Sequence, residues 1–192
     1  MDNNDLYENE DYKNLDSSNK SLQAITFEEC IFTKCKFIES KFINVKFVSC
    51  RFISCDFSLA KFTNVRFFEA RFDKCNLKGI NFSDLDGNMI SFEFQECILD
   101  YCFFNNLDIR KTKFLKCSMK EMQFEDMNLQ YCIFTNSDLE NSIFRDCDLR
   151  YADFRNAENY FVDTENNRIT KARFSLPEAQ ALLKNFDILI EE

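Results

Sequence analysis

The sequence predicts an all-β solenoid, a rod of stacked coils built from a five-residue unit. A bulky apolar residue recurs at nearly every fifth position from Phe27 to Phe82, and the series resumes from Phe94 to Phe154. The residue two places before most of these centres is small, and the other three positions of each unit are mostly polar. A period of five matches neither an α-helix nor a β-strand, so it indicates a repeat architecture.

Each unit can form one short side of a coil, because the central residue and the small residue two places earlier would point into a shared interior. Four sides of five residues make a coil of about 20 residues. In the second half the centres alternate Phe with Leu, Ile or Met, and this sub-period fits a coil with four sides. We therefore expect one axial core and a protein that works through its outward surface.

The 10 cysteines fit this interior better than they fit disulfides or a metal site. Each lies two residues before a centre, in the position that elsewhere mostly holds Ser, Ala, Val or Thr. Free Cys fills such a position as a small buried hydrophobe, and the chain has no His to complete a zinc site. Five of them form one predicted column if two residues are inserted along it: Cys35, Cys55, Cys75, Cys97 and Cys117.

The series of centres breaks once, and the step across the break is too long for the five-residue period. We predict that two extra residues lie within residues 83–88, where Asp86-Gly87 is suited to a turn. With Gly87 in the small position, Met89 is predicted to be the first centre of the second series.

The repeats define the predicted domain boundaries. The β-helix is expected over residues 22–174, with a short interruption at residues 83–88 and a loop near residues 160–168. Residues 1–21 are acidic and lack the repeat, so we predict that they form an arm outside the rod.

The C-terminal segment, residues 175–192, predicts a helix and tail rather than another coil. Ser175 and Glu178 have the spacing of a capping box, and apolar residues follow at helical spacing. A stack of coils leaves unpaired backbone at its last turn, so this helix is expected to cap the rod, to join a second copy, or to do both. The residues expected to do so are Leu182, Leu183, Phe186, Ile188 and Ile190.

Composition excludes several classes of function. The net charge is −9, so nucleic acid is not expected as a direct ligand. The chain has no His, 2 Gly and 1 Pro, which removes His-based catalysis and Gly-rich phosphate loops. We therefore expect no catalytic residues, no metal and no cofactor. The acidic start resembles no signal peptide and no apolar run could span a membrane, so the expected location is cytoplasmic.

The five-residue segments resemble the A(D/N)LxX unit of pentapeptide repeat proteins, as in residues 50–54 (CRFIS), 75–79 (CNLKG) and 152–156 (ADFRN). The resemblance extends over the repeat region, and it implies the right-handed quadrilateral parallel β-helix of that family. With its single interruption and C-terminal helix, the chain also resembles the Qnr-type quinolone-resistance proteins and the microcin immunity protein. That subgroup implies a homodimer through the C-terminus and an acidic rod that mimics DNA and binds DNA gyrase or topoisomerase IV, giving antibiotic resistance.

The charges are uneven along the chain. Residues 25–82 carry 10 basic and 6 acidic side chains, whereas residues 83–154 carry 7 basic and 14 acidic ones. Assigning the second half to four sides places an acidic face on two adjoining sides, over a length of about 14 Å in which DNA carries about eight charges. The residues predicted to form this partner-binding face are Asp100, Glu121, Glu125, Asp126, Asp138, Glu140 and Asp146.

Two interpretations of this face stay open at the level of sequence. It could bind a topoisomerase in place of DNA, or the chain could be a general protein-interaction scaffold with no topoisomerase role. The interruption is much shorter than the projecting loops of many Qnr-type proteins. If those loops carry topoisomerase protection, the second interpretation is favoured.

Overall fold

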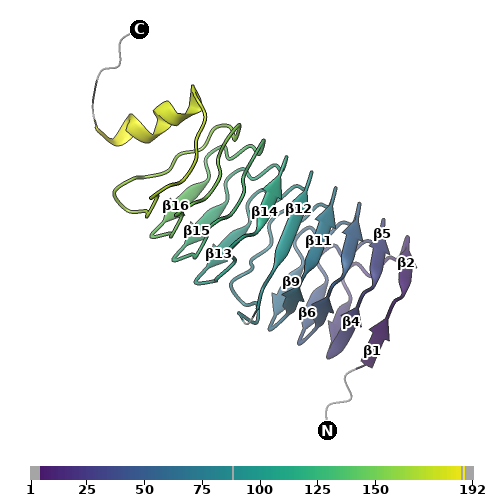
Figure 1. Cartoon of the computed structure of the whole chain (residues 1–192). Helices are drawn as coiled ribbons and strands as arrows, with labels where there is room; N and C mark the ends of the chain where they lie inside the picture. The colour runs from purple at the N-terminus through teal and green to yellow at the C-terminus, as the bar shows by residue number, and fades with distance from the viewer. Residues whose placement is uncertain (1–4, 88, 187, 189–192) are drawn as a thin grey trace.

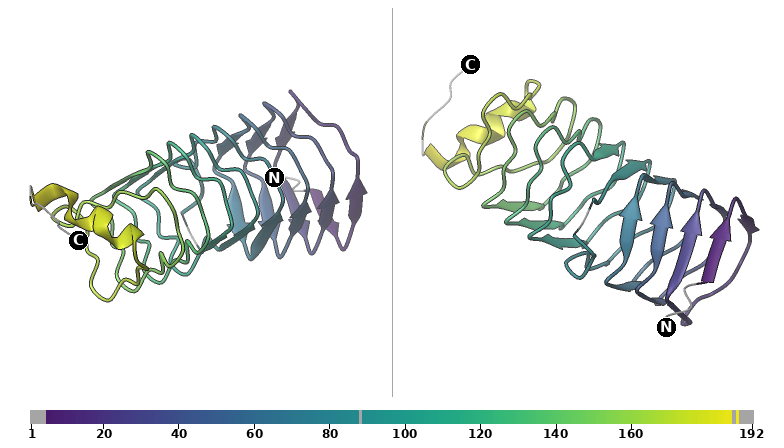
Figure 2. Two further views of the ribbon diagram at one scale, coloured as in Figure 1. Left: turned by 90° about the horizontal axis from the view of Figure 1, so that it is seen from above. Right: turned by 60° about the horizontal axis from the view of Figure 1, so that its bottom comes forward.

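The computed structural model describes residues 5–87, 89–186 and 188 of the chain, which form a rod with a short helix at one end (Figure 1). The chain winds as a right-handed parallel β-helix with four sides, and the two termini lie at opposite ends of the rod (Figures 1 and 2). Each strand pairs with the strand one coil away, so that Tyr7 lies beside Phe27 in register. The 20-residue coil that the repeat predicts is therefore confirmed.

Three of the four sides carry parallel sheets. The first side holds β1 (Asp5–Glu8), β4 (Ile25–Glu28), β7 (Lys46–Val48) and β10 (Arg66–Phe68). The second side holds β2 (Asp11–Lys13), β5 (Ile31–Thr33), β8 (Arg51–Ile53), β11 (Ala70–Asp73), β12 (Phe92–Gln95) and β14 (Lys113–Leu115). The fourth side holds β3 (Ser21–Gln23), β6 (Lys41–Ile43), β9 (Lys61–Thr63), β13 (Phe103–Asn105), β15 (Gln123–Glu125) and β16 (Ile143–Arg145).

Isolated bridges replace strands on the third side along the described rod and on the first side after the interruption. On the third side, for example, Ser118 pairs with Ile98 on one neighbouring coil and with Asp138 on the other. On the first side, the bridges run from Asp108 to Arg168. These sides keep the coil-to-coil register without a continuous strand.

The core is an axial stack of the predicted centres. Phe52 is fully buried, and its ring stacks on Phe32 and Phe72 at centroid distances of 5.0 and 4.7 Å. Offset stacking of this kind adds to the free energy gained from burying apolar area.

The small interior position also has a hydrogen-bonding role. The 10 cysteines are free and buried, and the Cys50 thiol donates to the carbonyl of Phe27 at 3.4 Å. Ser137 makes the same bond to Phe114 at 3.1 Å. Burial raises the pKa of Cys50 to about 12, which keeps the thiol protonated at neutral pH. Where this position holds Cys or Ser, the side chain therefore ties its coil to the one before it.

The N-terminal segment differs from the predicted arm. The described part of residues 1–21 forms the first coil, because β1 and β2 pair with β4 and β5. Tyr7 stacks on Phe27 and Tyr12 stacks on Phe32, with centroids 5.5 and 4.8 Å apart. The acidic outward positions and the use of Tyr in place of Phe conceal this coil in the sequence.

The interruption lies at the end of the predicted segment and the residues just after it. Asp86 keeps the ordinary register, since its N–H donates to the carbonyl of Val65 at 2.9 Å, and Phe92 is already paired with Ala70. The two extra residues therefore fall between Asp86 and Phe92. Met89 was predicted to be a centre, which is wrong: 73% of its surface is exposed, and Ile90 and Phe92 are buried instead.

The C-terminal end closes with η1 (Glu178–Phe186), a 3-10 helix. The Ser175 hydroxyl accepts a hydrogen bond from the N–H of Asn156 at 2.9 Å, so it attaches the segment to the coil below instead of forming the predicted capping box with Glu178. Among the described residues, no helix has the length and apolar content needed to cross a membrane.

Candidate partner-binding face

The structure brings the seven predicted carboxylates to two adjoining sides of the C-terminal half. Glu121 lies at the corner between the third and fourth sides, in the left-handed conformation (φ 55°) that recurs at the corners of the coils. Asp126 and Asp146 lie at the next corner in the same conformation, one coil apart. These corner residues are exposed, because the next residue in each case, Met122, Met127 or Cys147, takes the interior position.

Lys120 lies on the outer surface of the third side, directly after the buried centre Met119. Its Nζ lies 2.9 Å from Asp138 Oδ2 and 2.7 Å from Glu140 Oε2. The hydrogen bonds from Lys120 to Glu140 and Asp138 raise the pKa of the ammonium group, so it stays charged. This pairing neutralises part of the acidic side.

Asp138 is held in place from several directions. Asn159 donates to it at 2.8 Å, and the backbone N–H of Glu140 donates at 3.2 Å. Partial burial raises the pKa of Asp138, but the hydrogen bonds from Asn159 and Lys120 outweigh this effect and hold the pKa below its usual value. Asn159 was not among the predicted residues, because it occupies a position where the period calls for a bulky centre.

The remaining carboxylates differ in whether an ion pair neutralises their charge. Arg145 pairs with Glu125 at 3.2 Å. Asp100 accepts hydrogen bonds from the Ser118 hydroxyl at 2.6 Å and from a backbone N–H, without an ion pair. Within the described chain, no cation lies within salt-bridge distance of Glu121, Asp126 or Asp146. The face therefore combines ordered, hydrogen-bonded carboxylates with freely charged corner carboxylates.

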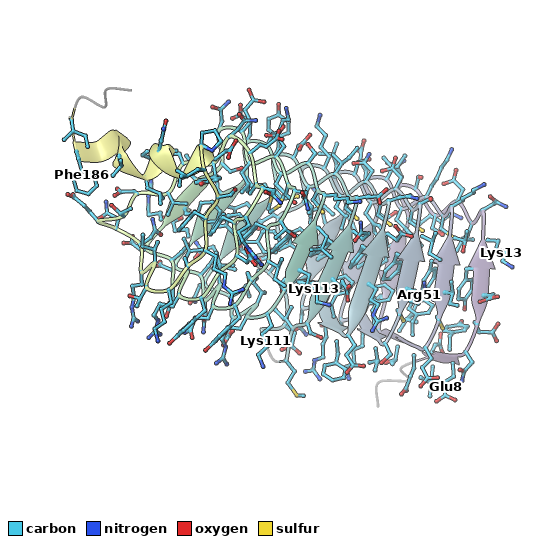
Figure 3. The ribbon with its side chains drawn as sticks, turned by 45° about the horizontal axis from the view of Figure 1, so that its top comes forward. Glu8, Lys13, Arg51, Lys111, Lys113 and Phe186 are labelled. Atoms are coloured by element: carbon cyan, nitrogen blue, oxygen red, sulfur yellow. The ribbon has the colours of Figure 1, made fainter. Side chains whose placement is uncertain are left out.

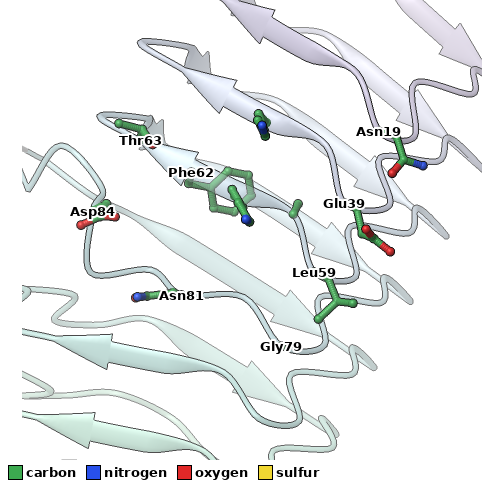
Figure 4. Close-up of a pocket in the computed structure, with 11 residues that line it drawn as sticks. Asn19, Glu39, Leu59, Phe62, Thr63, Gly79, Asn81 and Asp84 are labelled. Atoms are coloured by element: carbon green, nitrogen blue, oxygen red, sulfur yellow. The ribbon is translucent and has the colours of Figure 1, made fainter.

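The geometry favours binding to a surface over catalysis. The carboxylates spread over exposed coils and do not converge on an enclosed cavity, and the described residues contain no cluster suited to a metal ion. A groove of about 770 Å³ exists in the N-terminal half, where Leu59 and Gly79 form part of its wall and Phe62 lies among its residues (Figure 4). None of the seven carboxylates lines this groove.

The residues predicted at the C-terminus separate into two groups. Leu182 is half-buried and packs against the core together with Ala181, so it covers the last coil. Leu183, Phe186 and Ile188 are 40 to 53% exposed, and Phe186 lies at the far end of the helix (Figure 3). Ile190 lies outside the described residues. An apolar surface therefore remains at this end of the rod.

The comparisons with known proteins agree with this architecture. A family model described as a pentapeptide repeat region matches residues 25–94 and 86–154. A trypsin-treated form of QnrB1, described as a plasmid-mediated fluoroquinolone resistance protein, is similar with a TM-score of 0.58 and 18% identity over 98% of each chain. Full-length QnrB1 gives a TM-score of 0.50 and 18% identity over 95% of this chain and 100% of that chain.

A third solved structure is HetL, a pentapeptide repeat protein involved in heterocyst differentiation regulation from the cyanobacterium Nostoc sp. Its TM-score is 0.44 and its identity 15%, over 89% of this chain and 87% of that chain. No curated protein sequence matches the chain. At these identities, the similarity to QnrB1 concerns the fold.

Proposed function

This chain belongs to the pentapeptide repeat family, and we propose that it is a non-enzymatic DNA mimic that binds a type II topoisomerase, with DNA gyrase as the expected partner. Binding would protect the enzyme from quinolone or microcin-type poisons. The observation that carries the proposal is the acidic face on the third and fourth sides of a rigid rod. QnrB1, which shares the fold, is described as a fluoroquinolone resistance protein.

The charge density of this face suits a DNA-binding groove. Seven carboxylates and two cations lie on three coils, which span about 14 Å at the usual strand spacing. Duplex DNA presents about eight charges over that length. The net charge of the face is lower than that of DNA but of the same order, and the carboxylates at the corners stand furthest from the axis.

The exposed apolar residues of the C-terminal helix support a homodimer joined through this end. Leu176 is 79% exposed, and Leu183, Phe186 and Ile188 extend the apolar surface. A dimer joined here would bring two acidic faces near its middle and give a longer DNA-like rod. Light scattering in solution tests this part, and a monomeric mass would contradict it.

A supercoiling assay with DNA gyrase tests the function. The protein is expected to relieve a quinolone or microcin block, or to inhibit supercoiling by competing with DNA. Reversing the three corner carboxylates that lack ion pairs, as Glu121→Lys, Asp126→Lys and Asp146→Lys, should abolish the effect and leave the core intact. The control reverses Glu28, Glu29 and Glu39, which changes the net charge equally in the other half.

The outcomes separate the two candidate functions. If the wild-type protein neither affects supercoiling nor relieves the block, the topoisomerase role is wrong. The alternative, a general protein-interaction scaffold, rests on the small size of the interruption, since only five residues lie between Asp86 and Phe92. It predicts that a pull-down recovers a partner without a DNA-binding groove.

A further inference from the structure

The four-sided coil separates the charges of the C-terminal half in a way that the net charge conceals. Across the axis from the acidic face, the first and second sides carry a set of cations. Between residues 108 and 173 these cations are Arg110, Lys111, Lys113, Lys116, Arg150, Arg155, Arg168, Lys171 and Arg173. The carboxylates on the same two sides are Asp108, Asp148 and Asp153. Lys111 and Lys113 are labelled on this part of the rod in Figure 3.

The corner between the first and second sides forms a basic and aromatic edge, defined by the column Lys111, Tyr131, Tyr151 and Lys171. The two Tyr rings stack with centroids 4.7 Å apart and an interplanar angle of 5°. Lys171 Nζ lies 5.5 Å from the centroid of Tyr151, a cation–π contact. Both rings are substantially exposed, at 46 and 38%. The edge therefore offers ordered ring edges and hydroxyl groups between two lysines.

The ion pairs beside this edge leave an excess of positive charge. Asp148 is shared by two arginines, since it lies 2.6 Å from Arg150 and 3.5 Å from Arg168. Asp108 pairs with Arg110 at 2.9 Å. Within the described residues, no carboxylate lies within salt-bridge distance of Lys111 or Lys171. The two lysines are therefore free to neutralise the charge of a ligand.

The interruption adds a concave end to the edge. A groove of about 480 Å³ lies where the inserted residues meet the first coil of the column. Gly87, Met89 and Ile90 line it from the insertion, the ion pair of Arg110 and Asp108 lines it from the first side, and Lys111 and Tyr131 line it from the edge. The insertion thus places a pocket that contains the unpaired cation Lys111 at one end of a straight row of cations and hydroxyl groups.

We propose that this edge binds the phosphate backbone of duplex nucleic acid. Lysines and Tyr hydroxyls are groups that contact phosphates, and a rigid straight row of them matches a rigid linear polyanion. A flexible acidic peptide would have to lose its conformational freedom to align with the same row. The net charge does not prevent this binding, because most of the acidic face lies on the third and fourth sides. Asp126 and Asp146 lie one side away from the edge, and salt screens exposed charges beyond about 8 Å.

The inference is independent of the proposed topoisomerase role, which uses the opposite two sides. Binding is measured by fluorescence anisotropy of a labelled 20-base-pair duplex of mixed sequence with the full chain. If the edge neutralises about three phosphates, the affinity should fall about 40-fold between 50 and 200 mM salt. The double variant Lys111→Glu and Lys171→Glu should bind too weakly to detect, or show a salt dependence of about 4-fold.

A matched control changes Lys34→Glu and Lys74→Glu, which lie at corners with the same left-handed backbone in the other half. This control should keep most of the affinity, and the melting temperature checks that both variants fold. The inference is wrong if the wild type does not bind the duplex, if both double variants lose affinity equally, or if polyglutamate competes as well as DNA at equal charge. A mass that rises through association of copies, and falls in the Lys111 and Lys171 variant, would assign the edge to self-association and also overturn it.

Discussion

The coils before the interruption and the coils after it share one interior and differ in what they present to solvent. Before it, cations stack on neighbouring coils, as in the in-register pairs Lys41–Lys61 and Arg51–Arg71. After it, carboxylates gather on the third and fourth sides and cations on the first and second. The same buried repeat therefore supports two unrelated surfaces, because only two of every five residues are needed for the core.

The two halves also differ in backbone. The first side changes from the strands β1, β4, β7 and β10 to isolated bridges after the insertion, and its centres change from Phe to Leu and Ile. Phe alone does not explain the strands, since Phe37 and Phe57 lie on the third side, where bridges also replace strands. Side and residue type together do not explain it either, because Phe134 and Phe154 continue the second side beyond β14 at isolated bridges.

Truncating core side chains should have the largest effects on stability, and it compares the core before the interruption with the core after it. Phe72 stacks on Phe52 and Phe94 at 4.7 and 5.1 Å, so Phe72→Ala should lower the free energy of unfolding by about 3–5 kcal/mol. Leu129 is buried without ring stacking, so Leu129→Ala should cost about 2–4 kcal/mol. Urea unfolding with unchanged slope measures both. A cost below about 1 kcal/mol for either would contradict a tightly packed column.

Removing a polar side chain from the interior position should have the next largest effect. Asn167 accepts from the N–H of Cys147 and donates to the carbonyls of Phe144 and Asp163, all at 2.9 Å. Asn167→Ala should cost about 3 kcal/mol, because three backbone groups lose their partner. Ser137→Ala, which leaves two backbone groups of the coil below without their partner, should cost about 1–2 kcal/mol. Equal costs would show that the loop at Asn167 does not depend on this side chain.

Acid should destabilise the C-terminal half by protonating carboxylates that are paired with arginines. The hydrogen bond from Arg150 lowers the pKa of Asp148, and the hydrogen bond from Arg155 lowers that of Asp153. Because both folded pKa values lie below the unfolded value of about 4, their stabilisation is complete above pH 4 and is lost as the pH falls through the folded values. Hydrogen exchange at pH 3 should show faster opening at these coils than at pH 6. Asp153→Asn should reduce that difference.

Single charge reversals should have the smallest effects, and their signs should differ between the halves. Lys61 lies beside Lys41 in register, so Lys61→Glu replaces a repulsion by an attraction and should stabilise the rod by about 0.2–1 kcal/mol. Lys120 lies between Asp138 and Glu140, so Lys120→Glu should destabilise it. Melting temperatures in low salt measure both shifts, and 1 M salt should reduce them. Shifts of the same sign would contradict the charge arrangement described for the two halves.

Much of the fold follows from local pattern, and the errors have physical causes. The centres from Phe27 to Phe154 and the ten buried cysteines follow from a period that each coil repeats. The first coil was missed because Tyr7 and Tyr12 replace Phe among acidic neighbours. Met89 was wrongly predicted as a centre because it satisfies the period in sequence, whereas Ile90 and Phe92 are buried in the coil.

The sequence predicted which residues lie on the two sides of the candidate face, but not the contacts that these residues make. Assigning residues to four sides was enough to group Glu121, Glu125 and Asp138 on adjoining sides. The shared ion pair at Lys120 and the hydrogen bond from Asn159 depend on side-chain positions across coils, which the period does not specify. The C-terminal residues Leu182 and Leu183 were predicted together, yet only the first packs against the core.

The sequence by itself determined most of the residues that lie inside, because bulky and small side chains at a fixed spacing of five can be buried together only in a shared axial core. Only the tertiary structure decided which charges face the same direction. A residue's neighbour on the surface is the one about 20 positions away, or about 22 across the insertion, so summed charge along the chain says little about charge around the axis.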